Sequence, residues 1–85
     1  MDKHLSHPDI LKRLKRAEGH LKAIVAMLEG ERACVDIAQQ LQAVEKALGN
    51  AKRELIHDHI EHCLEEGSDN RAGLAELKVL ARYLA

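Results

Sequence analysis

Apolar residues recur in the first third of this chain at alternating intervals of four and three positions, the spacing of a helix that buries a single stripe. Ser6 is suited to cap such a helix and Pro8 to its first turn, while Gly30 is suited to its end. The pattern therefore predicts a helix over residues 7–29. Its stripe consists of Ile10, Leu14, Ala17, Leu21, Ile24 and Leu28.

A second stripe with the same spacing predicts a longer helix over residues 32–66. Gly49 and Asn50 are turn-forming residues, and a turn there would fold the segment into a hairpin. The heptad phase passes through the pair without a slip, which favours one continuous helix over the hairpin. The stripe consists of Ile37, Leu41, Val44, Leu48, Ala51 and Leu55, and the same phase continues to His59 and Cys63.

A third, shorter helix is predicted over residues 70–84, after the helix stop at Gly67 and a capping segment at Ser68. No segment alternates apolar and polar residues in the manner of a strand. The fold class is therefore all-α. We expect one domain over residues 1–85, with a loose arm at residues 1–5 and three helices.

The second helix also carries three soft metal ligands: Cys34 near its start, and His59 and Cys63 near its end. His59 and Cys63 are one turn apart and share a face. A helix rises about 1.5 Å per residue, so one unbroken helix would hold Cys34 and Cys63 roughly 43 Å apart. The three ligands then meet only if a second copy runs antiparallel, whereas a hairpin would join the cysteines within one chain.

Two thiolates and an imidazole suit Cu(I) or Zn, and imidazole also admits Ni and Co. A four-coordinate ion needs one more ligand, for which Asp2, His4 and His7 are candidates on the N-terminal arm. The competing interpretation is that both cysteines are small buried apolar residues and His59 is an interior histidine. The shared phase of the two cysteines and the histidine favours the metal site.

Composition limits the classes of function that we expect for this chain. Tyr83 is the only aromatic residue in 85, and a chain this small commonly needs oligomerisation to be stable. Without a Gly-rich loop or a candidate oxyanion hole, we expect neither an enzyme nor a binder of small organic substrates. No bilayer-spanning run or signal peptide is seen, so we expect a cytoplasmic protein with reduced thiols and no membrane partner.

Charge is segregated along the chain, although the net charge is only −1. Basic residues crowd the first helix and the middle of the second, and an acidic run extends from Glu54 to Asp69. This distribution is either an ordinary solvated surface or a face that binds a polyanion such as DNA. The basic groups are Lys12, Arg13, Lys15, Arg16 and Lys22 in the first helix, and Lys46, Lys52 and Arg53 in the second.

Four segments carry a specific resemblance: RLKRAEGHLKAIVAMLEG, the AC at residues 33–34, DIAQQLQAVEKAL and HDHIEHC. Over about residues 7–84 the chain resembles the CsoR/RcnR/FrmR family of small bacterial metal-sensing transcriptional repressors. The resemblance implies a three-helix protomer whose second helices pair antiparallel into a four-helix-bundle-like homodimer. Two dimers then form a flat homotetramer that binds operator DNA when free of metal and releases it on binding the effector, which derepresses metal efflux or resistance genes.

Carried over by position, Cys34 of one protomer and His59 and Cys63 of the other match the Cu(I) ligands of the copper-sensing branch. The N-terminal histidine of nickel- and cobalt-sensing members falls at Asp2, so Cu(I) is expected first and Ni(II) or Co(II) stays open. His59 argues against the persulfide-sensing branch, and Met1-Asp2 against the formaldehyde branch.

We expect the DNA contacts to come from Lys12, Arg13, Arg16, Lys46 and Arg53, with Arg32 and Lys52 as further candidates. Two other functions compete with the repressor: a cytosolic metal buffer that binds no DNA, and a purely structural helical oligomer.

Overall fold

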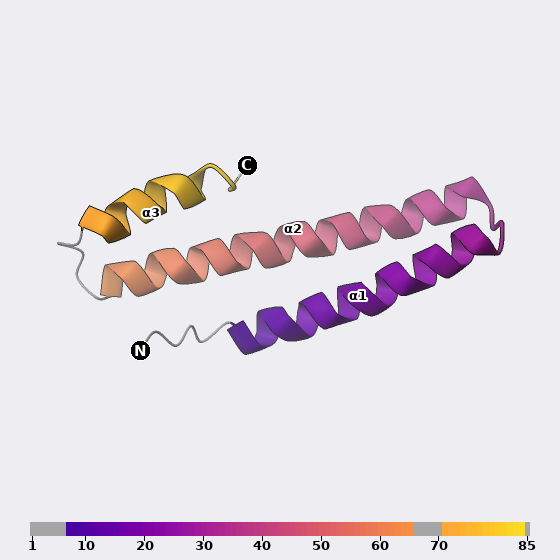
Figure 1. Ribbon diagram of the computed structural model, residues 1–85, viewed down its shortest axis with the longest axis horizontal. Helices are drawn as coiled ribbons and strands as arrows, with labels where there is room; N and C mark the ends of the chain where they lie inside the picture. The colour runs from indigo at the N-terminus through magenta and orange to yellow at the C-terminus, as the bar shows by residue number, and fades with distance from the viewer. Residues whose placement is uncertain (1–6, 66–70, 85) are drawn as a thin grey trace.

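The computed structural model describes residues 7–65 and 71–84, with side chains described over residues 7–62 and 73–84. Three helices follow one another: α1 (His7–Glu29), α2 (Cys34–Glu65) and α3 (Arg71–Ala81). Figure 1 shows α1 and α2 running antiparallel side by side, with α3 folded back along the C-terminal half of α2. The all-α, three-helix fold predicted from the sequence is confirmed, and the described residues contain no strand.

Two helix ends differ from the expected positions. α2 begins at Cys34 rather than at residue 32, because the amides of the three residues after α1, residues 30–32, donate back to carbonyls of that helix and end it. α3 ends at Ala81 rather than at residue 84. Beyond it, the amides of Arg82 and Tyr83 donate to carbonyls three residues back, at 3.2 and 2.9 Å, so the chain tightens into a turn there.

A Schellman motif ends α1. The amide of Arg32 donates to the carbonyl of Met27 at 3.0 Å, and the amide of Glu31 donates to the carbonyl of Leu28 at 3.2 Å. In this motif the residue in the left-handed conformation is Glu31, with φ of 54°. Gly30, which the sequence marks as the helix stop, lies one position too early to take that role.

α2 passes through Gly49 and Asn50 as one unbroken helix, which confirms the continuous helix and excludes the hairpin. Asn50 accepts a hydrogen bond from Arg53 Nη2 at 2.6 Å. The guanidinium of Arg53 also lies over Gly49, where an added Cβ would be 3.4 Å from Nη2. Gly49 and Asn50 therefore hold an arginine against the helix instead of turning the chain.

The core uses only every second member of each predicted stripe. Ile24, Ile37 and Val44 form a buried cluster with Met27 packed against it. The leucines that alternate with the buried positions stay 41–60% exposed, and Ile56, which lies outside the stripe, is buried as well. The buried residues are Ile10, Ala17, Ile24, Ile37, Val44, Ala51 and Ile56, and the exposed leucines, here called the leucine strip, are Leu14, Leu21, Leu28, Leu41, Leu48 and Leu55.

The protomer is long and thin, with extents of 55 × 23 × 13 Å. Its smallest dimension is close to the diameter of a single helix, about 10–12 Å with side chains. The radius of gyration is 17.1 Å, whereas about 12 Å is typical of a compact chain of this length. The three helices therefore lie in one layer, and no part of the chain within residues 7–65 and 71–84 forms a second layer over either broad face.

Candidate metal centre and nucleic-acid interface

His59 is the described member of the predicted ligand set near the C-terminal end of α2. Its side chain is 22% exposed, and its Nε2 atom lies 3.1 Å from Oε1 of Glu76 on α3. A proton on Nε2 would face this carboxylate, and the lone pair of the neutral ring would then lie on Nδ1, the nitrogen left to bind a metal. A carboxylate behind a histidine ligand is common in metal sites, so this residue pair fits a metal-binding role.

A cavity of about 200 Å³ lies between the start of α1, the end of α2 and α3. His7 lines it together with His59 and Glu76, and its other walls are Leu55, Ile56 and Leu80. His7 is therefore the candidate for a fourth ligand that the structure brings to the neighbourhood of His59. The other two candidates, Asp2 and His4, lie outside the described residues.

Cys34 lies at the opposite end of the molecule from His59. It is the first residue of α2, and its thiol is exposed and outside any disulfide. Cys63 belongs to α2 one turn after His59, but its side chain lies outside those described. Within the described residues of one protomer, no three His, Cys, Asp or Glu side chains gather as a metal site. A single straight helix separates Cys34 from His59, so these two cannot bind one ion within a protomer.

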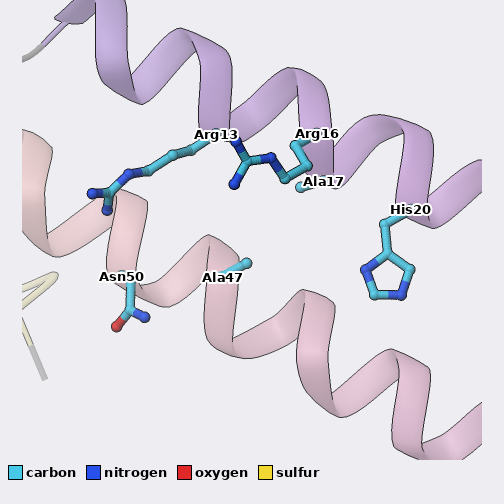
Figure 2. Close-up of a pocket in the computed structure, with 6 residues that line it drawn as sticks. All are labelled: Arg13, Arg16, Ala17, His20, Ala47 and Asn50. Atoms are coloured by element: carbon cyan, nitrogen blue, oxygen red, sulfur yellow. The ribbon is translucent and has the colours of Figure 1, made fainter.

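A cationic groove lies between α1 and the middle of α2. It has a volume of about 320 Å³ and is lined by Arg13, Arg16, Ala17 and His20 of α1 and by Ala47 and Asn50 of α2. Figure 2 shows Arg13 and Arg16 reaching from α1 toward α2, and His20 one turn farther along α1. Two of the five predicted DNA contacts therefore lie in one concave site.

Short polar contacts hold the side chains of this groove. Arg13 Nη1 pairs with Glu54 Oε2 at 2.7 Å, across α1 and α2. His20 Nε2 and Gln40 Oε1 are 2.6 Å apart, a hydrogen bond that also joins the two helices. Arg53, another predicted contact, is held by Asn50 beside the groove. Neighbouring side chains thus hold Arg13, His20 and Arg53 in place.

The remaining predicted DNA contacts lie outside the groove. Lys12 and Lys46 are exposed, as are the two further candidates, Arg32 and Lys52. Sequence reasoning missed Glu54, Glu76, His20 and Asn50 as members of either site. Only Glu54 had a usable signal, because it directly follows a basic pair at the point where the sign of the charge reverses.

Across residues 7–65 and 71–84, no helix is both long and apolar enough to cross a lipid bilayer.

Comparison with known proteins assigns the family. The model of the metal-sensitive transcriptional repressor family matches residues 6–83. The chain is 41% identical over 70 residues to the copper-sensing transcriptional repressor CsoR of Mycobacterium ulcerans, a match that covers 82% of this chain and 60% of the relative. It is 35% identical over 91 residues to the copper-sensing repressor CsoR of Bacillus subtilis, covering 91% of this chain and 90% of the relative.

A solved structure agrees with these relatives. The nickel-responsive transcriptional regulator InrS superposes with a TM-score of 0.81 at 27% sequence identity, and the match covers 100% of this chain and 99% of that one. The chain spans about 60% of the length of the mycobacterial relative and nearly all of the other two proteins. Sequence, fold and coverage together show that the chain belongs to the metal-sensitive transcriptional repressor family.

Proposed function

We propose that this protein is a metal-responsive transcriptional repressor. Its metal-free assembly binds operator DNA, and metal binding releases the DNA and derepresses genes for metal efflux or resistance. Family membership supports the repressor role, and the names of the relatives support metal as the effector.

The observation that carries the proposed metal site is the unbroken helix α2 with ligands at both ends. An antiparallel second copy would place Cys34 of one protomer beside His59 and Cys63 of the other. The pairing that brings the two cysteines level centres near Leu48, a member of the leucine strip that is 45% exposed. An exposed apolar side chain therefore lies where the two α2 helices would have to cross.

The leucine strip supports this assembly. An apolar groove on the surface of the protomer is lined by Leu14 and Leu21 of α1 and by Val44 and Leu48 of α2. A second layer of helices would bury this groove and supply the core that a one-layer protomer lacks. We therefore propose a homodimer formed on the leucine strip and, by family resemblance, a homotetramer of two dimers.

Cu(I) is the effector that the ligand set supports best, because two thiolates and one imidazole form a soft set. Two relatives are copper-sensing repressors, which agrees with this choice. The alternative is a Ni(II) or Co(II) sensor with a fourth ligand from the N-terminal region. His7 gives that alternative its own support, because it lines the same cavity as His59 and Glu76.

DNA binding and metal binding are coupled by linkage. If metal prefers the assembly that binds DNA poorly, DNA must weaken metal binding by the same factor, and a coupling of about 1–3 kcal/mol is typical. The two sites share α1 and α2: α2 carries His59, and the start of α1 lies at both the metal cavity and the cationic groove. A shift of α1 along α2 on metal binding would therefore move Arg13 and Arg16.

Two substitutions test this proposal. Cys34→Ala should leave a folded protein that binds promoter DNA but no longer releases it at saturating metal, because the site loses the ligand from the partner protomer. Arg16→Ala should weaken binding to the same DNA and leave metal affinity unchanged. Loss of DNA binding in Cys34→Ala would contradict the sensing role. Metal binding by wild-type protein without any DNA binding would instead favour a metal buffer.

A further inference from the structure

We propose that the cationic groove seats a phosphodiester group of the DNA backbone, and that Glu54 occupies Arg13 in the DNA-free protein as an internal competitor for that phosphate. The inference rests on the proposed repressor function and names the chemical group recognised by one of its sites. Glu54 thereby lowers the affinity of this chain for DNA.

The groove has the donors that a phosphate needs. Arg13 and Arg16 bring two guanidinium groups to one concavity, and guanidinium forks match phosphate oxygens in geometry and charge. On the facing helix, the Oδ1 atom of Asn50 accepts a hydrogen bond from Arg53. The NH₂ group of the same amide is then the part of Asn50 that can donate to a ligand. The volume of about 320 Å³ is about ten times the roughly 30 Å³ share of one water, so a phosphate fits with bridging waters.

Glu54 resembles the proposed ligand. Its carboxylate offers two anionic oxygens, as a phosphodiester does, and it contacts Arg13 at 2.7 Å. The pair is accessible to solvent, with Arg13 51% and Glu54 31% exposed. Exposed ion pairs of this kind contribute little to stability, so an incoming phosphate can replace the carboxylate on Arg13 at low free-energy cost.

This competition predicts that Glu54 weakens DNA binding. Glu54→Gln removes both the competitor and a negative charge beside the phosphate. An exposed ion pair contributes only a small free energy. The affinity for duplex DNA should therefore rise about two- to fivefold for each protomer in contact with DNA. The gain should fall as salt rises, because exposed charges are screened.

The experiment compares Glu54→Gln with Glu45→Gln in the full-length protein. Glu45 lies nine positions earlier in α2, about two and a half turns away and so on the opposite side of the helix; the charge change is the same. Binding to promoter DNA and to random duplex is measured by fluorescence anisotropy from low to high salt, with helicity and thermal unfolding checked by circular dichroism. The same comparison is repeated in an Arg13→Gln background, where Glu54 has no arginine to occupy.

The inference predicts tighter binding to both DNAs for Glu54→Gln, little change for Glu45→Gln, and a clearly smaller gain from Glu54→Gln when Arg13 is replaced, because only the relief of charge repulsion then remains. Equal effects of the two glutamate variants would overturn it, because charge alone would then explain the gain. A gain of undiminished size in the Arg13→Gln background would also overturn it. Failure of the wild-type protein to bind any DNA would overturn the repressor proposal and this inference together, whereas the first two results would leave the repressor proposal intact.

Discussion

At the scale of single residues, a neighbouring side chain can determine which atom of a residue is left to bind a ligand. His59 shows this most clearly, because Glu76 Oε1 lies 3.1 Å from its Nε2 and leaves Nδ1 as the ring nitrogen that we propose as the metal ligand. The spacing of Cys34, His59 and Cys63 made the candidate ligands visible in the sequence. Glu76 could not be identified from the sequence, because it reaches His59 only through the way α3 folds back on α2.

Replacing Glu76 tests its role behind His59. Glu76→Gln should lower metal affinity about 10- to 100-fold, the usual effect of removing the carboxylate partner of a histidine ligand. The measurement is a competition titration of reduced protein against a Cu(I) chelator. Glu61→Gln, an exposed residue of α2 near His59, is the control for lost charge. Equal losses in the two variants would show that Glu76 does not act through His59.

At the scale of helices, the heptad spacing predicted which segments are helical, and it also predicted that α2 is continuous. It did not predict which stripe members are buried. Within the protomer α1 and α2 bury Ile24, Ile37 and Val44, while the intervening leucines stay on the surface. Spacing alone cannot distinguish the buried residues from the exposed leucines. A stripe that faces two neighbouring helices has the same period as a stripe that faces one helix.

The end of α1 shows a second limit of sequence reasoning. A glycine near the end of a helix usually takes the left-handed position, but here the hydrogen bonds assign that conformation to Glu31. Glu31→Gly should therefore stabilise the protein by about 1 kcal/mol, since the left-handed conformation strains a residue that has a Cβ. Urea unfolding followed by circular dichroism at fixed protein concentration measures the change. An equal or lower free energy of unfolding would show that the strain at Glu31 is negligible.

At the scale of the whole molecule, the protomer is a single layer 13 Å thick with apolar side chains on its surface. The sequence pointed to association through chain length and through ligands at opposite ends of one helix. It could not indicate which residues form the contact, since this depends on which stripe members the protomer has already buried.

The leucine strip provides the test of self-association. Leu48→Gln should shift the protein toward smaller species, because it places an amide in the apolar groove where the second copy is proposed to pack. Sedimentation equilibrium at several concentrations measures the shift. Val35→Gln is the matched control: Val35 is 69% exposed on α2 and lies nine positions from buried Val44, so it faces away from the strip. An unchanged mass for Leu48→Gln would place the contact elsewhere.

The most direct test of the repressor proposal is an anaerobic titration of the reduced, metal-free protein with Cu(I) and, separately, Ni(II), while its binding to labelled promoter DNA is followed. We predict that Cu(I) releases the DNA at one ion per protomer and that Cys34→Ala protein stays bound. Release by Ni(II) alone would make the protein a nickel sensor and favour His7 as an added ligand. DNA binding that neither metal changes would contradict the proposed function.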